Sequence, residues 1–143
     1  MQVVITLLRL VWASPYTFLG LMIGAVGLAT GGRARLRGRA VEFHGGFVRW
    51  FVAHLPTGPG TLAMTLGHTI LGQSDTSLDV AHRHERVHVR QFERWGPFLG
   101  VAYLGASLVL WLAGRDAYHD NPFEREAFAA ERLKSTGRGD QHA

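Results

Sequence analysis

Residues 84–88 read His-Glu-Arg-Val-His, and this short segment holds the residue types best suited to carry chemistry. On an α-helix, residues i and i+4 lie on the same face, so the imidazoles of His84 and His88 can reach a single metal ion. Glu85 then lies beside the ion, where its carboxylate can take a proton from water that the metal activates. The competing interpretation is a polar, arginine-rich helix that carries two histidines by chance. The spacing favours a zinc site with Glu85 as the general base.

A catalytic zinc ion usually takes three protein ligands and keeps a fourth position for water. The segment 121–127, Asn-Pro-Phe-Glu-Arg-Glu-Ala, offers carboxylates for the third position. Pro122 suits the start of a helix, because its missing N–H costs nothing there. Glu124 and Glu126 would follow in the first turns of that helix, and both are candidate ligands.

These two motifs together resemble the gluzincin type of zinc metallopeptidase, in which an H-E-x-x-H helix precedes a helix that donates a ligating glutamate. Residues 84–97 and 121–128 are also similar to an uncharacterised family of small bacterial membrane-associated proteins, over about residues 60–130. In membrane-bound gluzincins the ligating glutamate is followed directly by alanine. The resemblance therefore implies that Glu126 is the third ligand, with Glu124 as the reserve.

The resemblance also implies an aspartate two or four residues beyond the ligand, which would orient a metal-bound histidine. Counted from Glu126, these positions hold Phe128 and Ala130. Without a carboxylate partner, the tautomer of the histidine is less well fixed. Three nearby carboxylates are candidates to replace the aspartate, those of Asp120, Glu124 and Glu131.

Residues 10–30 contain no charged side chain, and a segment of about 20 apolar residues matches the length needed to cross a hydrocarbon core. A cleaved signal peptide is the competing interpretation. However, Arg9 is an isolated basic residue and no clear small-x-small cleavage site precedes Gly31. We therefore expect residues 1–32 to form an N-terminal membrane anchor with a transmembrane helix.

Four arginines follow this segment at alternate positions, namely Arg33, Arg35, Arg37 and Arg39. Positive charge beside a spanning segment tends to stay in the cytoplasm, so the following domain is expected at the cytoplasmic face of the membrane. Anionic lipid headgroups are the expected partners of this charge. A nucleic acid is not expected, since no basic surface with interleaved aromatic residues accompanies the cluster. The chain has no cysteine, which excludes disulfides and thiolate zinc ligands.

The length of 143 residues suits a single domain, which we expect over residues 33–134, followed by a disordered tail at 135–143. The runs 41–44 and 47–52 flank two glycines and predict a β-hairpin. Residues 61–72 predict a third strand. In the resembling peptidases a strand at this point pairs with an extended substrate, which would assign that role to residues 64–71. Capping residues at 74–77 predict a helix over 78–94.

Gly96-Pro97 ends that helix, and the apolar run 98–114 predicts another one. If this second helix turns back against the first, it returns the chain to the neighbourhood of His84. If it crosses a membrane instead, Glu126 lies on the opposite side from His84 and His88, and the His-Glu-Arg-Val-His match is accidental. We expect the first arrangement.

The predicted fold class is α+β, a minimal zincin-like domain behind an N-terminal transmembrane helix. The expected function is hydrolysis of a peptide or protein substrate by a membrane-associated metallopeptidase, with one Zn²⁺ on His84, His88 and Glu126. The alternative is a non-catalytic membrane protein with a structural or vestigial metal site. Three residues are open candidates for stabilising the oxyanion, namely His68, Tyr118 and His119.

Overall fold

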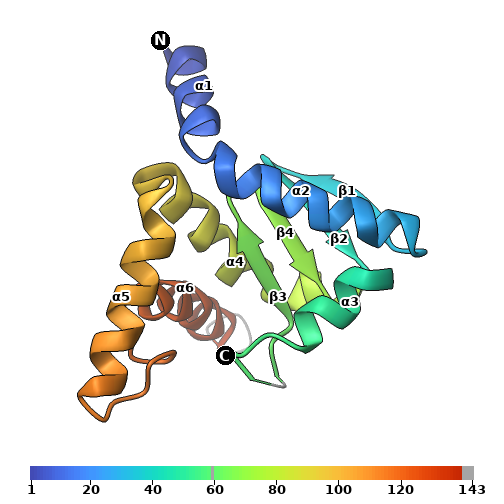
Figure 1. The fold of residues 1–143 in the computed structure, drawn as a ribbon. Helices are drawn as coiled ribbons and strands as arrows, with labels where there is room; N and C mark the ends of the chain where they lie inside the picture. The colour runs from blue at the N-terminus through green and yellow to red at the C-terminus, as the bar shows by residue number, and fades with distance from the viewer. Residues whose placement is uncertain (59, 140–143) are drawn as a thin grey trace.

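A mixed sheet lies at the centre of the molecule, with helices against both of its faces (Figure 1). The computed structural model describes residues 1–58 and 60–139, with residues 134–139 as backbone only. The described elements, in chain order, are α1 (Gln2–Trp12), α2 (Ser14–Ala29), β1 (Arg33–Arg37), β2 (Ala40–His44), α3 (Gly46–Ala53), β3 (Ala63–Leu66), β4 (Thr69–Gly72), α4 (Asp75–Trp95), α5 (Phe98–Leu112) and α6 (Pro122–Gly139). The α+β class predicted from the sequence is confirmed.

The strands of this sheet follow the order β1-β2-β4-β3. β1 pairs with β2 and β3 pairs with β4 in antiparallel fashion, whereas β2 and β4 are parallel. β3 therefore lies at an edge, and among the described residues one side of its backbone has no partner strand. Such an edge leaves N–H and C=O groups available to a further extended chain.

Helices α2 and α3 cover one face of the sheet, and α4 covers the other. The apolar layer under α2 and α3 is formed by Phe43, Val48, Val52, Leu66 and Leu71. The layer between the sheet and α4 is formed by Ala40, Ala63, Ile70, Leu78, Ala81 and Val89. α4 is thus held on the sheet along one side, which fixes the direction in which its remaining side chains point.

Three glycines allow α2 to lie directly on the sheet. A Cβ atom added at Gly20, Gly24 or Gly27 would come within 2.6 Å of Thr69, Phe43 or Val48. Side chains larger than hydrogen at these positions would therefore push the helix away. Residues 14–29, which the sequence analysis assigned to a membrane anchor, thus pack directly against the sheet.

The chain reverses between α4 and α5 at Gly96, which has a φ of 55°. A Cβ atom at this position would meet the indole of Trp12 at 2.2 Å, so both the conformation and the space require glycine. α5 then runs at 114° to α4, and α6 packs against α4. The predicted break at Gly96-Pro97 and the return of the chain toward His84 are confirmed.

The hairpin predicted around Gly45-Gly46 is wrong. Residues 40–44 form β2, but residues 47–52 lie in α3, and the hairpin partner of β2 is β1. Val48 and Val52, four residues apart, both face the sheet and are buried. An apolar run of this kind fits a helical period as well as a strand period, and the contact with α2 and the sheet decides the outcome.

The third strand predicted over residues 61–72 is also corrected. The segment forms two strands, β3 and β4, with a turn at Gly67, which has a φ of 62°. By contrast, the helix predicted over 78–94 is confirmed as α4. Its N-cap is Ser74, whose side chain accepts a hydrogen bond from the backbone N–H of Ser77 at 3.1 Å.

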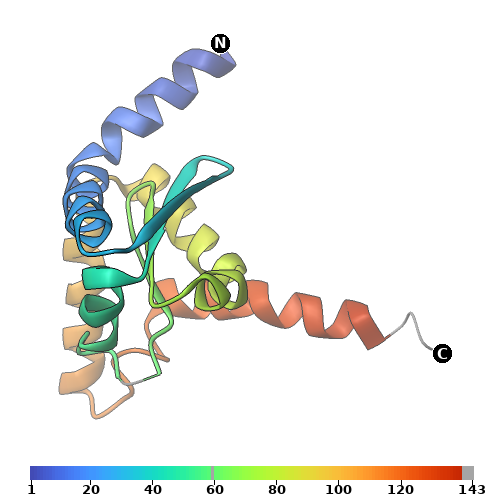
Figure 2. The ribbon, with the colours of Figure 1, turned by 90° about the vertical axis from the view of Figure 1, so that its right-hand side faces the viewer.

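The C-terminal tail predicted to be disordered from residue 135 is helical up to Gly139, because α6 continues that far. Residues 140–143 lie outside the described part of the chain. Figure 2 shows α6 extending away from the rest of the molecule, on the side opposite α2, α3 and α5.

None of the helices in the described part of the chain is by itself long and apolar enough to cross a membrane. Two pairs of consecutive helices reach the required length and composition only when the two helices of a pair are counted together. Both pairs are bent where their helices meet. α1 and α2 meet at 65°, and α4 and α5 at 114°. The continuous helix expected over residues 10–30 is interrupted at Ala13, so a transmembrane anchor stays a prediction.

Three of the four clustered arginines form ion pairs that join the β1–β2 hairpin to α4. The guanidinium of Arg35 contacts Glu42 at 2.6 Å, Asp75 at 2.5 Å and Asp79 at 2.9 Å. Arg37 also contacts Asp79, and Arg39 contacts Glu93 at 2.8 Å. The positive charge of these arginines therefore has partners within the chain. Contact with lipid headgroups stays a prediction.

The pair between Arg35 and the fully buried carboxylate of Glu42 is expected to be important for stability. Replacing Arg35 with alanine should lower the free energy of unfolding by about 3 kcal/mol, since a buried charge then loses its nearest partner while Arg37 stays 3.6 Å away. Chemical denaturation in a mild detergent measures this change. The control is Arg33→Ala at an exposed position of the same strand, which should change stability by less than about 0.5 kcal/mol. Equal effects of the two substitutions would contradict the assignment.

Candidate metal centre

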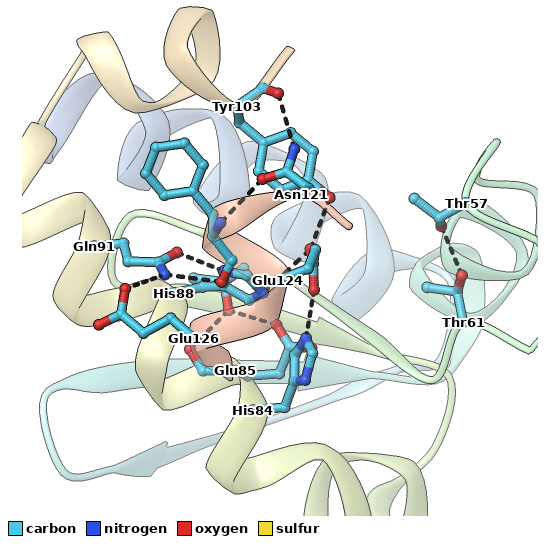
Figure 3. A network of polar contacts seen from close by, with 12 residues as sticks. Thr57, Thr61, His84, Glu85, His88, Gln91, Tyr103, Asn121, Glu124 and Glu126 are labelled. Carbon is cyan, nitrogen blue, oxygen red and sulfur yellow. Dashed lines mark hydrogen bonds and ion pairs between the residues drawn. The ribbon is translucent and has the colours of Figure 1, made fainter. Parts of the chain in front are cut away.

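His84 and His88 of α4 and Glu124 of α6 form a buried cluster that could hold a metal ion. Figure 3 shows the two imidazoles pointing toward the Glu124 carboxylate. Nε2 of His84 lies 2.9 Å from Oε2 of Glu124, and Nε2 of His88 lies 3.4 Å from Oε1. One ligand atom from each residue lies within 4.8 Å of the other two. Two imidazole nitrogens and one carboxylate oxygen are a donor set suited to Zn²⁺.

The start of α6 is fixed by Asn121, which is fully buried. Its amide nitrogen donates hydrogen bonds to the carbonyl of Tyr103 and to the hydroxyl of Ser107 on α5, at 3.0 and 2.8 Å. Its side-chain oxygen accepts a hydrogen bond from the backbone N–H of Phe123 at 3.0 Å. These bonds set the rotation of α6 and direct Glu124, in its first turn, toward the histidines.

The Glu124 carboxylate has a further partner on α5. The hydroxyl of Tyr103 donates a hydrogen bond to Oε1 of Glu124 at 2.7 Å (Figure 3). Glu124 is therefore held from three elements, α4, α5 and α6. A carboxylate positioned in this way loses little conformational freedom when it binds a metal ion.

The ring nitrogens of the histidines that face away from Glu124 each lie near a further side chain, although Nδ1 of His84 forms no hydrogen bond in the described part of the chain. Nδ1 of His88 lies 2.9 Å from the side-chain oxygen of Gln91 and donates to it. Nδ1 of His84 lies 3.3 Å from the carboxylate of Glu131. In the metal-free arrangement Nε2 of both residues faces Glu124 and can donate to it; with a metal ion bound, an imidazole that keeps its proton on Nδ1 would offer the lone pair of Nε2 to the ion. Of the three carboxylates considered for this orienting role, Glu131 contacts His84, Glu124 lies in the cluster, and Asp120 pairs with Arg115.

The structure brings Glu124, and not Glu126, to the histidines, which corrects the choice between the two glutamates. Residues two apart on an α-helix point about 200° from each other, so only one of them can face the cluster. Glu126 instead accepts a hydrogen bond from the amide of Gln91 at 2.9 Å. Gln91 in turn contacts Nδ1 of His88. Glu126 is therefore linked to that histidine through the side chain of Gln91.

The electrostatics of the cluster favour a bound cation. Burial works against a charge on His88, but its hydrogen bond to Glu124 and the nearby charges of Glu85 and Glu124 outweigh burial and raise its pKa to about 9. Burial likewise works against the charge of Glu124, but hydrogen bonds from His84 and His88 outweigh it and lower the pKa of this carboxyl below its usual range. A proton shared by His88 and Glu124 would therefore compete with a metal ion for this place.

Glu85 is buried next to the cluster and contacts the edge strand. The hydroxyl of Thr65 on β3 donates a hydrogen bond to Oε2 of Glu85 at 2.7 Å. Glu85 belongs to the wall of the same cavity as His84, His88 and Glu124. Glu85 thus lies beside the cluster and outside its three candidate ligands, and its role as general base stays a prediction.

A cavity of about 330 Å³ opens at the cluster. Its walls are built from α2, the loop after α3, β3, α4, α5, Tyr118 and α6, and most of the wall's surface is apolar. The loop is braced by a hydrogen bond between the hydroxyls of Thr57 and Thr61 at 2.6 Å (Figure 3). Cavities of this size are suited to small ligands or to a few side chains of a peptide.

Among the three candidates for stabilising an oxyanion, only Tyr118 reaches the cavity in the described part of the chain. Burial raises the pKa of its hydroxyl above the usual range, and the negative charge of Glu124 adds to the effect. The hydroxyl therefore keeps its proton and can donate it in a hydrogen bond. His119 is exposed and pairs with Asp116 at 2.9 Å, whereas His68 lies at the β3–β4 turn, 3.1 Å from Glu93.

Sequence reasoning missed Thr65, Tyr103 and Asn121, whose contacts join four elements at the site. No local pattern marks Thr65 or Tyr103, because their importance depends on how β3 and α5 lie against α4. Gln91 has a weak signal, since it follows His88 by three residues and so shares its helix face.

The chain matches no protein-family model, no curated protein and no solved structure. The function proposed below therefore rests on the arrangement of its own residues.

Proposed function

We propose that this protein is a membrane-associated zinc metallopeptidase that hydrolyses peptide bonds, with Zn²⁺ held by His84, His88 and Glu124. The observation that carries the proposal is the meeting of two histidines, four residues apart on one helix, with a buried carboxylate from a helix distant in sequence. Glu85 and a cavity large enough for peptide side chains adjoin this cluster. A metal-ligand set, a candidate general base and a place for substrate thus occur together.

Zn²⁺ bound at this site would supply Lewis acidity to a water molecule and to the scissile carbonyl. The chain's own residues provide the proton transfers. Glu85 takes the proton from the attacking water and returns it to the leaving amine, while Thr65 holds the Glu85 carboxylate in place. Tyr118 donates a hydrogen bond to the carbonyl oxygen as negative charge develops on it.

The edge strand β3 is the proposed binding surface for the substrate backbone. Residues Ala63, Met64, Thr65 and Leu66 all line the cavity, and the outer side of β3 has no partner strand in the described chain. An extended peptide that adds to this edge would pass close to Glu85. The role proposed for residues 64–71 thus falls to β3 alone, since β4 is an interior strand.

Association with a membrane is supported by large exposed apolar side chains on α1, α2 and α5. A soluble monomer rarely exposes contiguous apolar surface on this scale. The arginines beside α2 support the cytoplasmic face as the location of the metal centre. Lipid is therefore one proposed partner, and a peptide or protein substrate is the other.

A non-catalytic metal or polar site is the second candidate. His84, His88 and Tyr103 each contact the Glu124 carboxylate, although Nδ1 of His84 has no hydrogen-bond partner in the described chain. A network of this kind can stabilise the junction of α4, α5 and α6 without turnover. The two candidates differ in whether the bound metal supports hydrolysis.

Metal content and its removal test the proposed function. The purified protein is expected to bind about one zinc ion per chain, and His84→Ala should bind none, because a catalytic site needs all three ligands. His54→Ala, at an exposed histidine of the α3 end, is the matched control and should keep its zinc. Metal analysis by mass spectrometry gives the contents, and casein cleavage should stop with a chelator and return with added Zn²⁺. Zinc in the wild type without any turnover would favour the non-catalytic candidate, and no zinc would overturn both metal assignments.

A further inference from the structure

The cavity beside the candidate metal centre is apolar over most of its wall. The side chains that supply this apolar surface come from α2, the loop after α3, β3, α4 and α5. They include Tyr16, Leu55, Leu66, Phe92, Leu99 and Leu104. The polar groups of the wall are mainly those of the metal cluster, of Glu85 and of the tyrosines. An apolar wall that surrounds a hydrolytic site selects apolar groups on either side of the bond to be cleaved.

Helix α5 forms one wall of this cavity and also faces outward. Among its large aliphatic and tryptophan side chains Leu99 is buried and Leu110 is partly buried, whereas the others are exposed, namely Val101, Leu104, Leu108, Val109, Trp111 and Leu112. Leu104 lines the cavity although it is 69% exposed, so it lies where the cavity meets the outer surface. The apolar wall of the cavity thus continues onto the outer apolar face of α5.

The outer faces of α2 and α5 lie on the same side of the molecule. Figure 2 shows α2, α3 and α5 together on one side, opposite the end of α6. α2 adds exposed apolar side chains to this side, namely Phe18, Leu19, Leu21, Met22, Val26 and Leu28. The sequence has no charged residue at positions 10–30 or 95–114, which cover α2 and α5. We define the exposed apolar side chains of these two helices as the outer apolar face.

A lipid bilayer is the occupant that suits the outer apolar face best. A protein partner is usually recognised by an apolar centre with a rim of charged and hydrogen-bonding groups, but the segments that form this face are uncharged over their whole length. Ser107 of α5 is already satisfied by the carbonyl of Ala117 at 2.8 Å. Trp12 and Trp111 lie exposed at ends of the apolar helices, as is common at membrane interfaces.

We propose that the cavity receives an apolar polypeptide segment from the bilayer, past Leu104, so that the substrates are membrane-embedded proteins cleaved beside large apolar side chains. The inference rests on the proposed peptidase function and names its substrate class. A polypeptide fits better than a lipid acyl chain because β3, which lines the cavity, offers backbone N–H and C=O groups at its open edge. An acyl chain has no groups to pair with them.

Two tryptophan substitutions on α5 separate entry into the cavity from contact with lipid. Leu104→Trp enlarges a side chain in the cavity wall, whereas Val101→Trp enlarges one that is 73% exposed and outside that wall. Both variants keep an apolar face for the bilayer. Zinc content equal to that of the wild type serves as the check that Leu104→Trp folds.

Binding is measured with the zinc-loaded Glu85→Gln protein, which is expected not to cleave, in vesicles of equimolar phosphatidylcholine and phosphatidylglycerol. The probes are two fluorescent peptides with the same transmembrane anchor, in which the residues next to the anchor are either leucine or serine. The leucine peptide should bind at least about tenfold more tightly, because each buried leucine contributes more than one tenfold step. Leu104→Trp should remove most of this preference, and Val101→Trp should leave it unchanged.

Equal binding of the two peptides, or equal effects of the two tryptophans, would overturn the inference. Displacement of the leucine peptide by a fatty acid at lower concentration would assign the cavity to an acyl chain, and a dimer that buries α5 would assign the outer apolar face to a second copy.

Cleavage of the two peptides by the wild-type protein separates the proposed peptidase function from the proposed substrate class. If the leucine preference is present but neither peptide is cleaved, the peptidase function fails and the binding site stands. If both peptides are cleaved equally well, the function stands and the substrate class fails.

Discussion

Glu124→Gln is expected to lower the affinity for Zn²⁺ by more than about 100-fold, beyond the range typical of residues that only orient a ligand. The reason is that the Glu124 carboxylate faces Nε2 of both His84 and His88, and an amide supplies neither its charge nor its ligand strength. Glu126→Gln should lower the affinity by about tenfold or less. In the described part of the chain Glu126 touches the cluster through Gln91 alone, and the amide oxygen of glutamine can still accept that hydrogen bond.

Competition with a zinc-binding dye at fixed pH measures both affinities, and circular dichroism checks that α6 remains folded. The comparison is well matched because both substitutions replace a carboxylate with an amide on the same helix. A larger loss for Glu126→Gln than for Glu124→Gln would show that Glu126 is the ligand. It would also mean that α6 is rotated by two residues from the arrangement described above.

The first half of the site could be predicted because its geometry is local. The separation of His84 and His88 fixes their common face once a helix is assumed. The helix itself is marked by the capping residue Ser74 before it and by Gly96-Pro97 after it. None of these signals requires knowledge of the rest of the fold, and the structure agrees with each of them.

The third member of the cluster could not be chosen from the sequence, because the choice depends on the rotation of α6. That rotation is set by the bonds from Asn121 to Tyr103 and Ser107 on α5, and so by the path of the chain through the turn at Gly96. The local match of glutamate followed by alanine pointed to Glu126. It differs from the observed position by two residues, which on a helix is enough to turn the side chain away.

The arginines at 33–39 illustrate a second limit. In the sequence they form a basic cluster beside an apolar segment, a pattern typical of membrane proteins. Their carboxylate partners are Glu42 on the neighbouring strand and Asp75, Asp79 and Glu93 on α4. Asp75 and Asp79 lie about 40 residues further along the chain, so only the packing of α4 on the sheet reveals that this charge is paired.

The segment after β2 was misassigned for a different reason. Residues 47–52 are bulky, β-branched in part and apolar except for Arg49, and two glycines precede them, so local preferences favour a strand. In the structure, α2 and the sheet together offer a surface for one helical face, and Val48 and Val52 fill it. Burial of both side chains outweighs a local preference that amounts to about 1 kcal/mol.

The second large effect is expected at Glu85. Glu85→Gln should abolish detectable peptidase activity, a loss of at least about 10² to 10⁴ in rate, because the amide cannot accept the proton of the attacking water. Zinc content and folding should stay close to those of the wild type. The carboxylate is not among the three clustered ligands, and the glutamine oxygen can still accept the hydrogen bond from Thr65.

Casein cleavage in detergent with added zinc, followed alongside metal analysis, separates a chemical role of Glu85 from a structural one. Asp120→Asn is the control, since it removes a carboxylate that pairs with Arg115 outside the cluster and should leave the rate within about twofold of the wild type. Activity of Glu85→Gln at the wild-type rate would exclude Glu85 as the general base. Loss of zinc together with activity would instead indicate that Glu85 supports the metal cluster, because a residue that only transfers protons has no reason to change metal affinity.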